Sequence, residues 1–285
     1  MKNIILLADT GADLSQEQIE KFQIKLVNMH INMGAQSYSD KNLNGEDIIN
    51  YYKENKVLAQ TSGANPYDFH QVFEEIRRES SDPIVYVSIS KDLSVSYKSA
   101  EIAAKDFDDI YILDSGLVSI GTGLLIKKLA EYIKAKGQID VEEILAYGEE
   151  LKKRIRLFAI PQSLEFLKAG GRLSNSQYLG AILFKIFPLL TIDSGRLVAS
   201  KKFRGSFRKA LISTLEEFFA GENIDLTSIE LLQSFGLTKR EEKFIEDALK
   251  VFNVDDFNWT EAGPLISSHA GPGVFALAGL VKEEN

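Results

Sequence analysis

Hydrophobic positions in the first half of the chain follow two patterns, short apolar runs and helical stripes. The apolar runs have the length of buried strands and lie at residues 4–8, 84–89 and 110–113, and residues 25–33 alternate like a further strand. The clearest stripe places Phe69, Phe73 and Ile76 on one helical face behind Pro66, with Asn65 as the helix cap. Strands that alternate with helices in this way favour an α/β sheet with helices on both faces.

The pattern changes after residue 156. Strands are predicted at 157–160, 189–192, 197–203 and 228–233, and helices at 163–168, 176–184, 207–218 and 239–252. The residues from Asp193 to Arg196 separate two of these strands and predict a hairpin turn. A chain of 285 residues also exceeds the size at which one core usually keeps growing. We therefore expect two domains, an N-terminal α/β domain over 1–156 and a C-terminal α+β domain over 157–285.

Composition narrows the possible chemistry. The chain has no cysteine, which excludes disulfides, thiolate nucleophiles and cysteine-bound metals. Its three histidines, His30, His70 and His269, lack the spacing of metal ligands, so the sequence predicts neither a metal nor a cofactor. No apolar stretch reaches the roughly 18 residues of a membrane span, and the first residues run directly into a predicted strand. We expect a cytoplasmic protein with at most peripheral membrane contact.

Charge is distributed unevenly along the chain. The formal net charge of -8 argues against general nucleic-acid binding. Residues 151–215, however, hold thirteen Lys and Arg against two acidic residues, so the remaining residues hold 20 basic and 39 acidic side chains. This basic segment either balances an acidic remainder or provides a docking face for an acidic partner or a phosphate.

Three loops at the predicted carboxyl ends of strands carry hydroxyl groups. The loop T-S-G-A-N-P holds Thr61 and Ser62, which are not needed as helix caps because Asn65 provides that cap. The loop S-K-D-L-S-V-S-Y holds Ser94 and Ser96 at a helix start, where the helix dipole favours an anion. The third is D-S-G-L-V-S-I-G-T-G at 114–123. We expect the loops to converge on one small anion, although hydroxyls that only satisfy loop backbone are the alternative.

Six motifs, taken together, carry a resemblance to a known family. They are A-D-T-G-A-D-L at 8–14, T-S-G-A-N-P at 61–66, L-S-V-S-Y-K-S-A at 93–100, L-D-S-G-L-V-S-I-G at 113–121, L-E-F-L-K-A-G-G-R-L-S at 164–174 and H-A-G-P-G at 269–273. In this order and spacing the chain resembles the DegV family of fatty-acid-binding proteins. It departs from the family pattern at residues 63–65, at Val95 and Ser96, and at Phe187.

The resemblance implies that one long-chain fatty acid lies in the cleft between the two domains. Its carboxylate would be bound by Thr61, Ser62, Ser94 and Ser96, with His269 closing over the head group. Its acyl chain would occupy an apolar tunnel, for which residues 179–184 and 187–190 are a candidate wall.

The resemblance also implies a protein partner. In this family the bound acid is presented to a separate ATP-dependent fatty acid kinase, and the acyl phosphate that forms feeds phospholipid synthesis. Arg172 and Arg204 would face the kinase or the phosphate, and both lie in the basic segment. On this interpretation the chain is a lipid carrier and not an enzyme by itself.

Two other functions remain as alternatives. The first is a serine esterase or hydrolase that uses Ser94 as nucleophile and His269 as base, although the chain lacks a G-x-S-x-G elbow. The second is a substrate domain related to dihydroxyacetone kinases, in which His269 would hold a carbonyl ligand. Direct nucleotide binding is disfavoured, because the sequence contains neither a P-loop nor a G-x-G-x-x-G motif after a strand.

Overall fold

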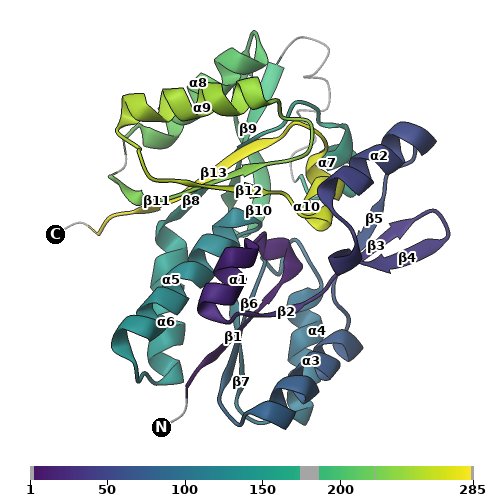
Figure 1. Ribbon diagram of the computed structural model, residues 1–285, viewed down its shortest axis with the longest axis vertical. Coiled ribbons are helices and arrows are strands. Elements are labelled where there is room, and N and C mark those ends of the chain that lie inside the picture. Colours follow the sequence, from purple (N-terminus) through teal and green to yellow (C-terminus); the bar gives the residue numbers. More distant parts are fainter. Residues whose placement is uncertain (1–2, 174–185, 222, 284–285) are drawn as a thin grey trace.

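The computed structural model describes residues 3–173, 186–221 and 223–283, which form two large sheets, one above the other along the long axis (Figure 1). The first sheet is wholly parallel and has the strand order β2-β1-β6-β7. In that order its strands are Lys25–Val27, Ile5–Asp9, Ile84–Ser88 and Ile110–Asp114.

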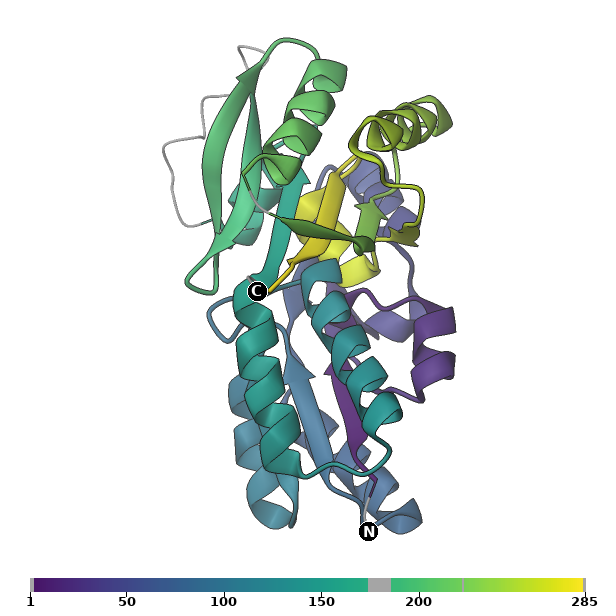
Figure 2. The same cartoon turned by 90° about the vertical axis from the view of Figure 1, so that its left-hand side faces the viewer.

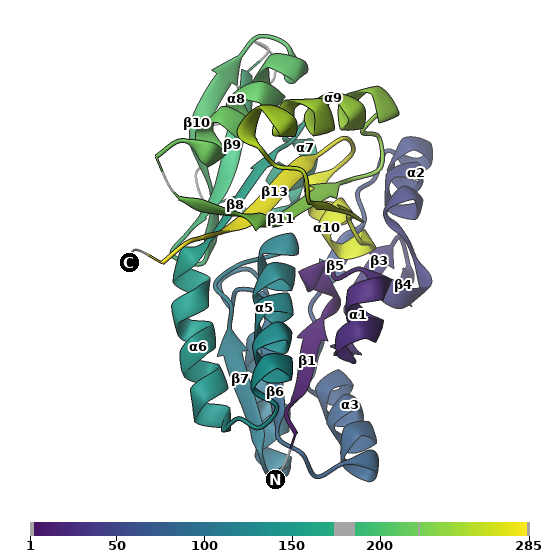
Figure 3. The same cartoon turned by 60° about the vertical axis from the view of Figure 1, so that its left-hand side comes forward.

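Helices cover both faces of the first sheet, as the sequence predicts (Figure 3). Because side chains alternate along a strand, Leu6 and Ala8 of β1 pack on α5 and α6, whereas Leu7 packs toward α3 and α4. The helices of this domain are α1 Gln16–Phe22, α2 Gly45–Asn55, α3 Pro66–Glu79, α4 Ser96–Ala103, α5 Ile120–Lys136 and α6 Val141–Arg154. The predicted cap of α3 is confirmed, because the Asn65 side chain accepts hydrogen bonds from the amides of Tyr67 and Asp68.

The second sheet has six strands in the order β10-β9-β8-β13-β11-β12. It is antiparallel except for the pair β11 and β12. Its strands are β8 Ile155–Ile160, β9 Ile186–Asp193, β10 Arg196–Arg204, β11 Ile224–Gln233, β12 Asn258–Glu261 and β13 Phe275–Val281.

Alternate residues of the second sheet pack in opposite directions. Phe275 and Leu277 of β13 face α8 Phe207–Phe219 and α9 Lys239–Leu249, which cover the outer face (Figure 2). Ala276 and Ala278 of the same strand face the first domain. The two domains therefore share an inner layer, in which α5 contacts both sheets.

A small third sheet at the side of the molecule was not predicted. Its strand order is β4-β3-β5, with β3 at His30–Met33, β4 at Gln36–Ser39 and β5 at Gln60–Ser62. The prediction of one strand over 25–33 was wrong, because the chain leaves the first sheet after β2. At that point the buried amide of Met29 donates to Asp40 Oδ1 at 3.1 Å, and β3 then pairs with β4 and β5.

The C-terminal half adds two short helices, α7 Glu165–Gly170 and α10 Pro264–Ala270. Both lie beside α2 of the N-terminal half (Figure 1). Tyr52 of α2 donates to Glu165 Oε1 at 2.5 Å, and its ring lies edge-on to Phe166. The helix predicted at 176–184 lies outside the described residues. Within the described ranges, no helix is long and apolar enough to cross a membrane.

Candidate functional site

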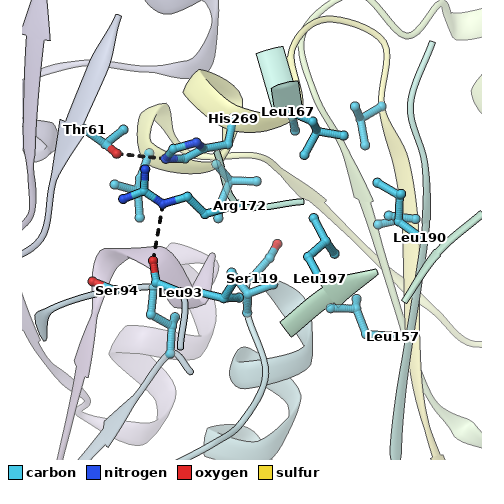
Figure 4. A pocket seen from close by; sticks show the side chains of 18 of the residues that line it. Thr61, Leu93, Ser94, Ser119, Leu157, Leu167, Arg172, Leu190, Leu197 and His269 are labelled. Carbon is cyan, nitrogen blue, oxygen red and sulfur yellow. Dashed lines mark hydrogen bonds between the residues drawn. The ribbon is translucent and has the colours of Figure 1, made fainter. Parts of the chain in front are cut away.

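A cavity of about 390 Å³ lies between the inner face of the second sheet and the loops of the first domain. Figure 4 shows polar side chains at one end of it, including Thr61, Ser94, Arg172 and His269. Apolar side chains surround the other end. They include Leu157, Ala159, Leu190, Leu197, Leu232 and Ala276, which come from five strands of the second sheet. The cavity thus has a polar head and an apolar tail.

Thr61 and His269 meet at the polar end. Thr61 lies on β5 and His269 in the last turn of α10, and the Thr61 Oγ1 to His269 Nε2 distance is 2.8 Å (Figure 4). The other ring nitrogen, Nδ1, is buried without a hydrogen-bond partner among the described residues. It packs against Gly170, where an added Cβ would lie only 2.2 Å from Nδ1.

This geometry fixes which atom donates. Burial, with a contribution from the Arg172 charge, lowers the pKa of His269 to about 4, so the ring is neutral at pH 7. A buried N–H without a partner is rarer and more costly than a buried acceptor without one, so the proton belongs on Nε2. In this tautomer the 2.8 Å contact is a hydrogen bond from His269 Nε2–H to Thr61 Oγ1. The Thr61 hydroxyl proton is then free to donate to a ligand in the cavity.

Ser94 and Ser96 have different positions, although the sequence predicts the same carboxylate-binding role for both. Ser94 lines the cavity, and its hydroxyl accepts from the amide of Ser96 at 3.2 Å. Ser96 is fully buried behind it, where its hydroxyl contacts Ser94 Oγ at 3.1 Å and accepts from the amide of Ala64 at 3.1 Å. Ser96 therefore joins the loop of Ser94 to the segment that follows β5, the strand of Thr61. Ser62 lies at the cavity rim and accepts from Asn32.

The two arginines predicted near the carboxylate lie in different places. Arg172 lines the polar end, and its guanidinium donates to the carbonyls of Gly170 at 2.6 Å and Leu93 at 3.5 Å. Its positive charge there favours an anionic ligand. Arg204 is the last residue of β10, is exposed and does not line the cavity. It remains a predicted partner contact.

The apolar end is built mainly by residues that the sequence did not single out. Ala159 pairs with Ala276 on one side and Leu190 on the other, and all three line the cavity. The small side chains leave space above the sheet, which a pattern of alternating alanines in β13 could have indicated. Of the predicted tunnel wall, 179–184 lies outside the described residues. Phe187 packs on Phe207 of α8 instead.

Ser119 is a further cavity residue within the third predicted loop. It has a strained backbone, with φ at 56°, and its hydroxyl donates to Asp13 Oδ2 at 2.5 Å. Asp13 Oδ1 also accepts from the amide of Gly263 at 2.9 Å, immediately before α10. Asp13 therefore connects the loop of Ser119 to the helix that carries His269.

Asp13 should make the stability of the protein depend on pH. Burial raises the pKa of Asp13 to about 7 and those of Asp9 and Asp40 to about 6. A carboxyl whose folded pKa is raised contributes stability that is complete below its unfolded pKa and is lost as pH rises through the folded value. We expect the wild-type protein to lose stability between pH 5 and pH 8.

Asp13→Asn should remove part of that loss, because an amide can accept from Gly263 and donate to Ser119 without ionising. Urea unfolding at both pH values measures the difference. We expect the gain of the variant over wild type to be about 1 to 3 kcal/mol larger at pH 8 than at pH 5. An unchanged pH slope would contradict the role of Asp13.

The site does not have the arrangement of a serine hydrolase. His269 Nε2 contacts Thr61, whereas Ser94 Oγ contacts Ser96, and no hydrogen bond joins Ser94 to His269 among the described residues. A nucleophilic serine requires a base within hydrogen-bond reach. The described residues also contain no group of three or more acidic or histidine side chains that could hold a metal ion.

Comparison with known proteins gives the same family as the six sequence motifs. The family model described as "Uncharacterised protein, DegV family" matches residues 3–282. The chain belongs to the DegV family. It is 31% identical to a DegV domain-containing protein of Caldanaerobacter subterraneus, over 96% of this chain and 99% of the other.

Solved structures of the DegV family have the same fold. A fatty-acid-binding DegV family protein from Thermus thermophilus is 27% identical, with a TM-score of 0.87, over 99% of this chain and 100% of the other. DegV from Bacillus subtilis, described as a fatty acid binding protein, is 24% identical, with a TM-score of 0.84 over the same shares. The predicted α/β fold with two domains is therefore confirmed.

Proposed function

We propose that this DegV protein is a cytoplasmic carrier that binds one long-chain fatty acid in the cavity between its domains. The observation that carries the proposal is the division of this cavity into a hydroxyl-lined end and an apolar end. At the polar end, Thr61 has a free hydroxyl proton, Ser94 offers a second hydroxyl, and Arg172 provides positive charge. The fatty-acid-binding relative from Thermus thermophilus supports the same ligand class.

The two ends contribute differently to binding. Burying about 14 methylene groups at about 0.8 kcal/mol each gives roughly 11 kcal/mol before the cost of immobilising the ligand. Each hydrogen bond from a hydroxyl to the carboxylate adds about 1.5 to 3 kcal/mol and is directional. The tail therefore provides most of the affinity, and the head group sets the orientation.

We further propose that the bound acid is presented to a separate ATP-dependent fatty acid kinase, which forms an acyl phosphate for phospholipid synthesis. Ser62 and Arg172 at the polar end are exposed, whereas Leu157, Leu190 and Leu232 at the apolar end are buried, so the carboxylate would be the accessible part of the ligand. Further exposed cations lie at Arg204, the last residue of β10, and at Arg208 and Lys209 on α8. These cations suit an acidic partner or a phosphate.

Mass spectrometry under denaturing conditions tests the lipid. Protein purified without delipidation is expected to release a long-chain fatty acid at close to one molecule per chain. An empty cavity after gentle purification, together with no uptake of added palmitate, would contradict the proposal. Hydrolysis of an aryl ester that is lost in Ser94→Ala would favour the esterase alternative instead.

A further inference from the structure

The turn between β9 and β10 contacts the loop that carries Ser94. From the sequence, the residues from Asp193 to Arg196 predict a hairpin turn and no contact with the other domain. In the structure, Ser90 Oγ donates to the carbonyl of Gly195 at 2.6 Å, and Arg196 lies 3.4 Å from Asp92 Oδ1. These two contacts cross from the second domain to the first.

Ser90 is the residue on which the loop of Ser94 is built. Its carbonyl accepts from the amides of Leu93 at 2.9 Å and Ser94 at 3.2 Å. Its hydroxyl also accepts from the amide of Asp92 at 3.2 Å, and its own amide donates to the carbonyl of Leu117 at 2.7 Å. Ser90 is fully buried. A displacement of Ser90 would therefore move Ser94.

The same hairpin forms part of the cavity wall. Leu190 and Thr191 of β9 and Leu197 of β10 line the apolar end. The hairpin thus contacts the apolar end of the cavity with its strands and the loop of Ser94 with its turn. A shift of this turn would change the position of that loop relative to the apolar end.

Gly195 allows this close seating. Its φ is +77°, and a Cβ added there would lie 2.8 Å from Ser90 Oγ and 3.1 Å from Asp92 Oδ2. Both its conformation and its contact therefore favour glycine. Gly137 at the end of α5 is a close comparison, because its φ is +75° and an added Cβ would meet nothing within 4 Å.

We propose that Ser90 and Gly195 are positioning residues for the ligand carboxylate, and we call Ser90, Asp92, Gly195 and Arg196 the hairpin clasp. The clasp holds the loop of Ser94 in place relative to the residues of β9 and β10 that line the apolar end of the cavity. Carboxylate recognition then depends on residues that do not touch the ligand. This inference rests on the proposed function and deepens it.

The test compares Gly195→Ala with Gly137→Ala, using palmitate and 1-hexadecanol as ligands of equal chain length. Both variants place an alanine at a similar positive φ, +77° at Gly195 and +75° at Gly137, but only Gly195→Ala brings a Cβ against Ser90. We expect Gly195→Ala to weaken palmitate binding at least 10-fold, because a displaced loop would misplace the Ser94 hydroxyl relative to the carboxylate. Hexadecanol has no carboxylate, so its affinity should stay within 2-fold. Gly137→Ala should change neither affinity.

Ser90→Ala is the second variant, and it is sufficient for the test if Gly195→Ala does not fold. It removes the hydrogen bonds of the Ser90 hydroxyl to Gly195 and to the amide of Asp92 without adding bulk, and the same selective loss for palmitate is expected. Equal losses for both ligands, or no loss, would overturn the clasp. A wild-type protein that binds neither ligand would overturn the proposed function itself.

Discussion

Replacing Thr61 by valine and Ser94 by alanine together is expected to weaken palmitate binding by roughly 10²- to 10⁴-fold. Each substitution removes one hydroxyl donor to a charged acceptor, worth about 1.5 to 3 kcal/mol. The side chains keep nearly the same volume, so the apolar contacts of the tail remain. Isothermal titration with palmitate, beside thermal unfolding of the same sample, measures the loss separately from any loss of fold.

Thr191→Val is the matched control for the head-group variant. It makes the same exchange of hydroxyl for methyl on a strand that forms the cavity wall, but its side chain shares the outer face of the sheet with its pairing partner Phe158. Palmitate affinity should stay unchanged, because this side chain does not face the tail. If Thr191→Val and the double variant lose affinity alike, Thr61 and Ser94 do not select the carboxylate.

Replacing Ala159 by phenylalanine should shorten the preferred ligand. Ala159 lies in the floor of the apolar end, between Ala276 and Leu190, so a phenyl ring there would occupy space proposed for the tail. Displacing about six methylene groups at about 0.8 kcal/mol each would weaken palmitate binding by roughly 10³-fold. The affinity of octanoate, whose tail is shorter, should change much less.

A competition assay with acids of increasing chain length measures this shift. Ala135→Phe on the exposed surface of α5 makes the same substitution away from the cavity and should leave all affinities unchanged. Unaltered palmitate binding by a folded Ala159→Phe protein would mean that the acyl chain lies elsewhere. That result would leave the assignment of Thr61 and Ser94 untouched.

Several elements of the fold were predictable because local chemistry determines them. Asn65 followed by a proline marks the start of α3, and the glycine at 137 ends α5. The apolar run 84–89 corresponds to β6, whose five residues are all buried. Two of the three hydroxyl-bearing loops could also be named in advance, because they follow β6 and β7 and strand ends in an α/β sheet collect ligands. The prediction of a loop was wrong for Thr61 and Ser62, which lie within β5 of the small antiparallel sheet. The domain boundary near residue 156 stays a prediction.

Packing between distant segments decided the rest. His269 contacts Thr61 across 208 residues of chain, and no local pattern specifies that the bond goes to Thr61 instead of Ser94. The different positions of Ser94 and Ser96 likewise depend on where the loop of Ala64 lies.

The sequence by itself therefore determined the type of the main elements, the family motifs and the hydroxyl groups available to a ligand. Only the tertiary structure decided which side chains face one another and where space remains. Periodicity and capping depend on neighbours within a few residues, so they are readable from the chain. The volume between two sheets depends on pairs such as Ala159 and Leu190, whose contact exists only after β8 and β9 have paired.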